Sequence, residues 1–259
     1  MEVIHGLKGP NLDLIVHSPG GSPEATEALV SYLRTKFNDI RVIIPQSAMS
    51  AATMLACASN RIVMGKHPFI SPIDPQLILH TQVGVQAVPA QAILDQFELA
   101  KMECEDPKKL GSWLPILSQY GPALLIQCKN AIELSQRLVS EWLESYMFED
   151  IEDATIISGK IAEDLANHQE FKSHGRHISR EKAKVMGLEG RGLVIADLEE
   201  DQEFQDLVLS VFHATTHTFS GTNAVKIIEN HNGKAFIKKQ QQILIQQQAP
   251  PPQTLDRPQ

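Results

Sequence analysis

The chain has 259 residues, of which 42% are hydrophobic and 21% are charged, as in globular proteins that bury one substantial core. Its formal net charge of −8 at pH 7 argues against general nucleic-acid binding, because that activity needs a basic face. The three cysteines show no metal-ligand spacing, and we interpret them as buried thiols in a reducing compartment.

Three short apolar runs rich in β-branched residues alternate with two helical patterns in the first quarter of the chain. In chain order these segments are residues 12–16, 23–36, 41–44, 50–59 and 61–64. Such an order predicts a parallel sheet with right-handed crossovers. Ser22 is the expected N-cap of the first helix, with Pro23 at its first position. Residues 1–9 are expected to form a short helix or a lead-in, and residues 66–87 a loop and an extended segment.

The first strand leads into two glycines, and the second leads to a serine at a helix start. Gly20 and Gly21 lack Cβ atoms, so their N–H groups can approach a ligand closely. The hydroxyl of Ser50 is expected beside unpaired helix N–H groups, including that of Ala51. Since both segments follow strands of one parallel sheet, topology brings them together. We predict a nucleophile, Ser50, beside an oxyanion hole formed by Ala51 and by Gly20 or Gly21. The alternative is a turn and a helix-capping serine.

The second half of the chain has a helical pattern. Helices are predicted at residues 89–104, 122–148, 153–167, 179–186 and 201–218. Residues 106–122 are interrupted by glycine and proline, and we interpret them as a flexible lid or an oligomer contact. Residues 239–259 are rich in glutamine and proline and are expected to be disordered, which leaves residues 1–238 as a single domain. No apolar run approaches the roughly 20 residues of a membrane span, so we expect a cytoplasmic protein.

Two segments, HSPGGSPEA at residues 17–25 and PQSAMSAATMLACASNRIVMGKHPFISPIDPQ at 45–76, resemble the serine dehydrogenase proteinase family. That family belongs to the ClpP/crotonase superfamily and is related to signal peptide peptidase A. SPGG is similar to its glycine loop, AMS to its nucleophile turn and PIDPQ to the segment that follows. SHGRHISREKAKVMGLEG at residues 173–190 is similar to its C-terminal half. The resemblance implies an α/β fold, with a ClpP/crotonase-like parallel-sheet core and a helical C-terminal half.

The resemblance supplies the nucleophile but no general base. Asp74 stands where Clp-type proteases carry a histidine, and it is a candidate either to orient a base or to accept backbone N–H groups. His17 directly precedes the glycine loop, and His174 lies in the C-terminal segment shared with relatives. Lys101, on a predicted helix, and a residue of a neighbouring subunit are the other candidates. Ser71 stands where the family commonly has glycine, which predicts a narrower loop.

These residues predict a serine-type peptidase in which Ser50 attacks a carbonyl of a peptide or protein substrate. No cofactor or metal is expected, since His213 and His217 share a helix face but have no third ligand nearby in the sequence. A crotonase-type acyl-CoA enzyme and a non-catalytic assembly subunit of the same fold are the alternatives. The superfamily resemblance implies a homo-oligomer, with an interface drawn largely from residues 89–148.

Overall fold

The computed structural model describes residues 2–81 and 84–240. The chain divides into two compact units, a larger one of Lys8–Leu209 and a smaller one of Met1–Leu7 with Ser210–Gln259. Helix α9 (Gln202–Gly221) belongs to the larger unit up to Leu209 and to the smaller unit beyond it. Compactness alone does not test independent folding, so the single domain over residues 1–238 stays a prediction. Of the predicted tail, residues 241–259 lie outside the described residues.

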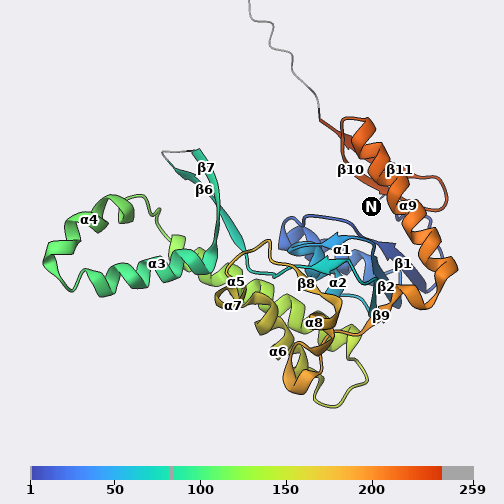
Figure 1. The fold of residues 1–259 in the computed structure, drawn as a ribbon, viewed down its shortest axis with the longest axis horizontal. Coiled ribbons are helices and arrows are strands. Elements are labelled where there is room, and N and C mark those ends of the chain that lie inside the picture. Colours follow the sequence, from blue (N-terminus) through green and yellow to red (C-terminus); the bar gives the residue numbers. More distant parts are fainter. Residues whose placement is uncertain (1, 82–83, 241–259) are drawn as a thin grey trace, which may run out of the picture. The chain divides into compact units, whose positions relative to one another are not determined.

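A four-stranded parallel sheet forms the centre of the larger unit (Figure 1). Its strands, in spatial order, are β1 (Asn11–Ile15), β2 (Asp39–Ile44), β4 (Arg61–Met64) and β9 (Ile195–Asp197). All three neighbouring pairs are parallel, so the predicted parallel α/β core is confirmed. β2 lies inside the sheet, and its apolar side chains Val42 and Ile44 are fully buried. A continuous apolar run is therefore the expected pattern for this strand.

Helices α1 (Pro23–Arg34) and α2 (Ala51–Cys57) connect the first three strands of this sheet. The hydroxyl of Ser22 accepts a hydrogen bond from Ala25 N at 3.2 Å, and a proline occupies the first helical position, as predicted. This cap satisfies one of the backbone N–H groups that a helix start leaves unpaired. The chain therefore turns into α1 directly after the glycine loop.

A second, smaller sheet brings distant parts of the chain together. Its strands are β3 (Ser47–Ala48), β5 (Phe69–Ile70) and β8 (Ile178–Ser179). β3 pairs with β5 in parallel, and β5 pairs with β8 antiparallel. A further parallel bridge joins Ser18 to Ala48. The glycine loop, the turn before α2 and the segment before β8 are thereby fixed to one another.

The rest of the larger unit is mainly helical, as predicted. Its elements are α3 (Ala90–Glu103), α4 (Pro107–Leu117), α5 (Leu124–Trp142), a π-helical turn (Leu143–Met147), α6 (Ala154–Ala166), α7 (His168–Phe171), α8 (Arg180–Val185) and 3₁₀ turns at Leu188–Gly190 and Leu198–Glu200. The expected interrupted segment at residues 106–122 is instead largely helix α4. Asp106 caps this helix by accepting from Lys108 N at 3.0 Å, and Pro107 occupies its first turn, where a missing N–H costs nothing.

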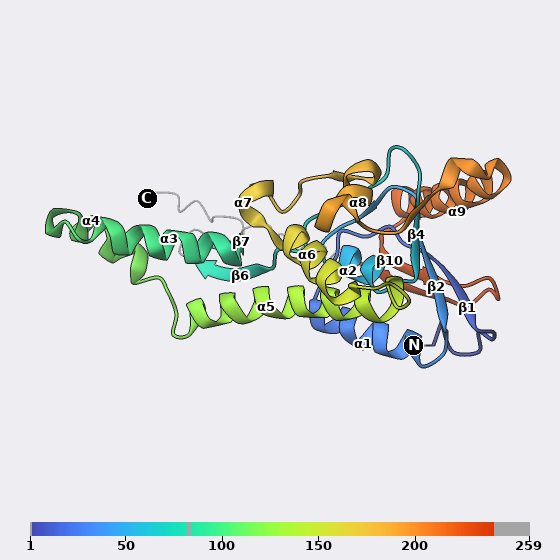
Figure 2. The ribbon, with the colours of Figure 1, turned by 90° about the horizontal axis from the view of Figure 1, so that it is seen from below.

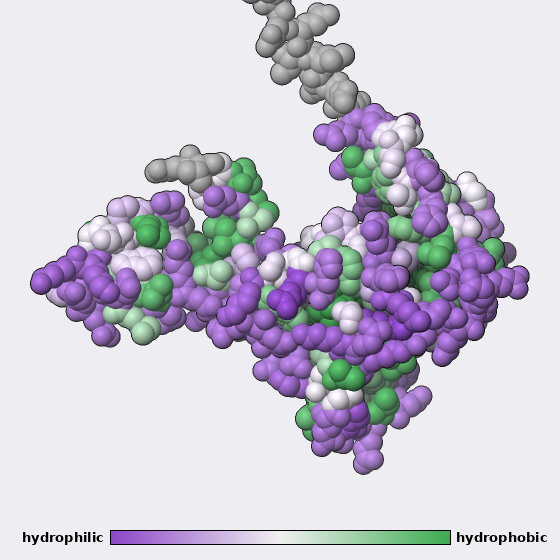
Figure 3. All heavy atoms as spheres, in the orientation of Figure 1, coloured by the Kyte–Doolittle hydropathy of each residue, from purple (hydrophilic) through white to green (hydrophobic). Residues whose placement is uncertain are grey.

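An antiparallel hairpin of β6 (Gln76–Thr81) and β7 (Gly84–Pro89) packs on α3. In Figures 1 and 2, the hairpin, α3 and α4 extend away from the parallel sheet of the larger unit, and we call them the arm. Figure 3 shows hydrophobic spheres on the arm among hydrophilic ones. Its exposed apolar side chains include Ile78, Val85, Leu99, Met102, Leu110 and Leu114. The arm thus carries large apolar side chains that the described part of the chain leaves exposed.

The smaller unit contains the second half of α9 and an antiparallel hairpin of β10 (Ala224–Glu229) and β11 (Ala235–Lys239). Its N-terminal residues form turns, so the short helix expected within residues 1–9 is wrong. Gly6 has a φ of +95°, which a right-handed helix does not allow. Among residues 2–81 and 84–240, no helix is both long and apolar enough to cross a membrane.

Candidate active site

Ser50 occupies a strained turn between β3 and α2. Its φ of 51° and ψ of −120° are rarely adopted by any residue except glycine. Although Ser50 precedes the helix, its side chain makes no capping hydrogen bond, and its hydroxyl has no partner in the described part of the chain. The capping alternative is therefore not what the structure contains. Strain of this kind on a strand–turn–helix is typical of a nucleophile that must stand clear of the sheet.

Buried hydroxyl groups hold this turn in place. Ser50 N donates to Ser71 Oγ at 2.8 Å, and Ser71 Oγ donates to the carbonyl of Pro72 at 3.0 Å. Thr53 Oγ1 lies 2.8 Å from the carbonyl of Ala48 and 3.0 Å from that of Ser71. The sequence marked Ser71 as a departure from glycine, but its function as an acceptor for the nucleophile turn was not predicted. Fixed backbone contacts of this kind allow the strained conformation to persist.

The glycine loop lies directly against this turn. Gly20 has a φ of +103°, and a Cβ atom built on it would lie 2.6 Å from the carbonyl oxygen of Met49 and 2.8 Å from Ser50 Cβ. Both distances are too short for a Cβ atom, so residue 20 must be glycine, both for its backbone angle and for its lack of a Cβ atom. The predicted neighbourhood of the glycine loop and Ser50 is present in the structure.

Backbone N–H groups in this region differ in their partners. Gly20 N donates to Ser18 Oγ at 3.1 Å. By contrast, the N–H groups of Gly21 and Ala51 have no hydrogen-bond partner among residues 2–81 and 84–240. A glycine N–H engaged by a side chain is less available to a substrate than an unpaired one. Of the two glycines that the sequence left open, the hydrogen bonding therefore favours Gly21 as a donor to a ligand.

Asp74 lies three residues after Ser71, the acceptor of the Ser50 N–H, and is the centre of a second group of polar side chains. Its side chain is almost fully buried, with 2% of the residue exposed. Oδ1 lies 2.8 Å from His174 Nδ1, and Oδ2 lies 2.9 Å from His168 Nδ1. The carboxylate therefore contacts one imidazole through each oxygen. Asp74 and His174 were predicted separately as site residues, whereas His168 was not predicted.

The small sheet brings the segments that carry Asp74 and His174 close together. Ile70 pairs with Ile178 in the antiparallel β5–β8 ladder. Asp74 lies four residues after Ile70 and His174 lies four residues before Ile178, and a turn in which Arg176 N donates to the carbonyl of Ser173 separates His174 from β8. The contact joins residues that are 100 positions apart in the chain.

A different contact positions His168. Ile73 N donates to the carbonyl of Leu165 at 3.0 Å, which ties the end of α6 to the segment that carries Asp74. Asn167 then caps α7 by accepting from Glu170 N at 3.1 Å, and His168 is the first residue of that short helix. In the sequence, His168 is marked only by its position directly after Asn167, since asparagine is a residue typical of helix N-caps.

A family described as ClpP-like SDH-type serine proteinase matches residues 7–194. The chain belongs to this family. Two uncharacterized proteins of Methanocaldococcus jannaschii are also similar to it: one is 39% identical over 70 residues, covering 27% of this chain and 24% of the relative, and the other is 35% identical over 86 residues, covering 33% and 27%. The chain thus matches about a quarter of the length of each relative. No solved structure matches it significantly.

The matched family region contains Ser50, Asp74 and His174, and it also contains the other predicted bases, His17 and Lys101. His17 is exposed, and its Nδ1 lies 3.3 Å from Ser47 Oγ. Lys101 is on α3, where its ammonium group forms an exposed ion pair with Glu98 at 2.7 Å. Asp74 therefore shares direct contacts with His174 and His168, whereas Lys101 is held by a neighbour on its own helix.

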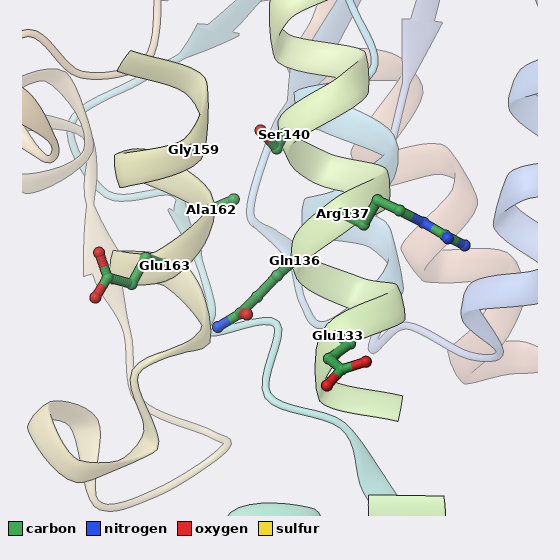
Figure 4. A pocket seen from close by; sticks show the side chains of 7 residues that line it. All are labelled: Glu133, Gln136, Arg137, Ser140, Gly159, Ala162 and Glu163. Atoms are coloured by element: carbon green, nitrogen blue, oxygen red, sulfur yellow. The ribbon is translucent and has the colours of Figure 1, made fainter. Parts of the chain in front are cut away.

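Other chemical features of the chain do not form a second site. An open hollow of about 300 Å³ lies between α5 and α6 (Figure 4), and none of its lining residues is a predicted site residue; they are Glu133, Gln136, Arg137, Ser140, Gly159, Ala162 and Glu163. The described residues include no group of three or more His, Cys, Asp or Glu side chains that could hold a metal ion. Cys57 and Cys128 are buried, but Cys104 is partly exposed, so the prediction of three buried thiols is wrong for Cys104.

Proposed function

We propose that this chain is a serine peptidase whose nucleophile is Ser50. The observation that carries the proposal is the strained backbone of Ser50, at φ 51° and ψ −120°, with its hydroxyl unpaired and the glycine loop packed against it. A residue is held in such a conformation only when its surroundings enforce it, and these positions cluster at reactive groups. Membership of a serine proteinase family supports the same assignment.

We assign the oxyanion hole to the N–H groups of Gly21 and Ala51. Both groups lack partners within the described chain, and Ala51 N would lie only 3.2 Å from a Cβ atom on Gly20, so the two segments are in contact. Negative charge develops on the carbonyl oxygen when the serine attacks. Two preorganised donors stabilise that charge, and losing one such donor costs about 2.7–4 kcal/mol in enzymes of this type.

We assign the general base to His174, oriented by Asp74. Beside an ionised carboxylate, which only accepts hydrogen bonds, the proposed base His174 carries its proton on Nδ1, the nitrogen 2.8 Å from Oδ1. Nε2 then keeps its lone pair and can accept a proton from the serine. Asp74 takes the position that Clp-type proteases give to histidine, and it works here as the orienting group.

The proposed reaction proceeds through an acyl-enzyme. Ser50 Oγ attacks the peptide carbonyl while its proton passes to His174 Nε2, and the carbonyl oxygen becomes an oxyanion bound by the two N–H groups. The imidazolium then protonates the leaving amine, the C–N bond breaks, and an ester forms on Ser50. Water, deprotonated by the same imidazole, hydrolyses the ester. A positioned base contributes about 10²–10⁴ to the rate of such steps.

We also propose that the active form is a homo-oligomer joined through the arm. An apolar hollow of about 340 Å³ lies between the arm and the start of α5, lined by Phe97, Leu117, Tyr120, Gly121, Ala123, Leu124, Leu125 and Ile126. Exposed apolar side chains lie on the hairpin and on α3 and α4, and exposed apolar surface is typical of protein–protein contacts. Light scattering at micromolar concentration should give a multiple of the chain mass of 28.7 kDa. A monodisperse monomer would overturn this part of the proposal.

Labelling with a fluorophosphonate probe tests the nucleophile. The oxyanion hole that stabilises a tetrahedral carbonyl adduct also stabilises phosphonylation, so the wild type should label and Ser50→Ala should not. Peptide mapping of the labelled protein should place the adduct on Ser50. Ser47→Ala, which removes a neighbouring hydroxyl on β3, is the matched control. If wild type labels no faster than Ser50→Ala between pH 6 and 9, the non-catalytic assembly subunit replaces the peptidase.

A further inference from the structure

Asp74 has two histidine partners, although a serine peptidase needs only one base. His168 Nδ1 lies 2.9 Å from Oδ2, while His174 Nδ1 lies 2.8 Å from Oδ1. Both imidazoles are largely covered, with 14% and 18% of their side chains exposed. The contacts use the same ring nitrogen, so either histidine would keep Nε2 available. The two residues must therefore be distinguished by what else holds them.

The chain around each histidine makes this distinction. Strand β5 pairs with β8, four residues beyond His174, and the next residue after β5, Ser71, accepts the N–H of Ser50. His174 is thus connected to the nucleophile by one short, buried segment. His168 instead opens α7, which is tied to this segment through Leu165 at the end of α6. The two histidines approach the carboxylate from separate elements.

Burial of the carboxylate gives the second histidine a physical task. A buried carboxylate oxygen without a donor keeps an unsatisfied lone pair, which is unfavourable. A carboxylate bound through only one oxygen can also rotate about its terminal torsion, because that torsion has a broad energy profile. A donor on Oδ2 satisfies the one requirement and prevents the rotation.

We infer that His168 is a positioning residue for the proposed peptidase: by donating Nδ1–H to Oδ2, it fixes Asp74 so that Oδ1 orients His174. This inference rests on the proposed function. His168 acts through the carboxylate and transfers no proton to or from the substrate. The need is for a donor at the position of Nδ1 and for nothing else from the ring.

Asparagine and phenylalanine substitutions distinguish hydrogen-bond donation at Nδ1 from proton transfer at Nε2. An asparagine amide places its donor near the position of Nδ1 but offers nothing at Nε2, whereas phenylalanine keeps a ring and removes both nitrogens. We expect His168→Phe to slow fluorophosphonate labelling of Ser50 by about tenfold, the rate equivalent of one strong hydrogen bond, and His168→Asn to restore it to within about threefold of wild type. His174→Phe and His174→Asn should both slow labelling by about 10²-fold or more, because neither provides a base.

Matched controls and a substitute variant keep the test decisive. His217→Phe and His217→Asn make the same chemical changes at an exposed histidine on α9 and should not change the labelling rate. Denaturation midpoints establish that each variant is folded. If His168→Phe does not fold, His168→Gln replaces it, since a glutamine amide places its donor near Nε2 instead of Nδ1.

Each remaining outcome overturns a defined part of the reasoning. Wild-type labelling in folded His168→Phe, or equal losses in His168→Phe and His168→Asn, overturns the positioning role while leaving the peptidase intact. If His168→Asn labels slowly and His174→Asn labels at about the wild-type rate, His168 is the base and the two assignments are reversed. A wild type that does not label Ser50 at all overturns the peptidase and this inference together.

Discussion

Replacing Gly20 by alanine tests the contact between the glycine loop and the nucleophile turn. The added Cβ atom would lie 2.8 Å from Ser50 Cβ, whereas carbon atoms prefer about 3.5–4.0 Å, so one segment must move by roughly 0.7 Å. A small rotation of the Gly20 backbone cannot relieve this clash, because the added Cβ atom would also lie 2.6 Å from the carbonyl oxygen of Met49. The φ of +103° adds a backbone penalty on the order of 1–2 kcal/mol for any L-residue.

The displacement predicts a larger effect on reactivity than on stability. Misplacement of reacting groups by about 1 Å can lower rates by about 10²-fold, so we expect Gly20→Ala to label with fluorophosphonate about 10²-fold more slowly than wild type. Backbone strain and overpacking together should lower the free energy of unfolding by about 2–4 kcal/mol. Domains with about 5–15 kcal/mol of stability stay mostly folded after such a loss.

Two further glycines provide comparisons for this variant. A Cβ atom on Gly21 meets no heavy atom within 4 Å, and its N–H is retained, so Gly21→Ala should label clearly faster than Gly20→Ala. Gly111, inside α4, also has open space and should tolerate alanine with unchanged labelling. Labelling rates and urea denaturation curves are measured for all three variants. The reasoning would be refuted if folded Gly20→Ala labelled at the wild-type rate. It would also be refuted if Gly20→Ala labelled as fast as Gly21→Ala.

Two other predictions concern buried polar groups. Ser71→Ala leaves the N–H of Ser50 without its acceptor at 2.8 Å, which should lower the free energy of unfolding by about 1–3 kcal/mol and slow labelling. An unchanged urea midpoint would contradict this prediction. Burial raises the pKa of Cys57 to about 12 and also raises the pKa of Cys128, so at pH 8 a disulfide reagent should react quickly with Cys104 alone in the folded protein and with all three thiols in guanidinium. More than one fast thiol before denaturation would show that these sites open.

Local patterns in the sequence were sufficient for the parallel core. Residues 61–64 form strand β4 with the predicted bounds, and the Ser22–Pro23 start of α1 has the predicted cap. Strand runs and helix starts depend on side chains a few residues apart, so they can be read without knowing the fold. The same holds for the pairing of Gly20 with Ser50, since both follow neighbouring strands of a parallel sheet and such ends meet at one edge.

At two other points, capping and position along a helix decided what composition did not show. Residues 106–122 contain glycine and prolines, but Pro107 occupies a helix start and Asp106 caps it, so α4 forms. Cys104 falls in a helical pattern, but it is the C-cap of α3, at the end of that helix, and it is partly exposed there. The position of each residue relative to a helix end decided both cases, and amino-acid composition does not contain that information.

Only the tertiary structure determined how the group of polar side chains around Asp74 is assembled. Asp74 meets His174 and His168 across 100 and 94 residues, through a two-residue strand pair and one backbone hydrogen bond from Ile73. Segments this short have no periodicity that a sequence can display, and any of the ten histidines could have reached the carboxylate on composition alone. The sequence by itself determined which residues could carry out the chemistry, and the folded chain decided which imidazoles share Asp74, because long-range contacts depend on the register of strands that pair only in the folded protein.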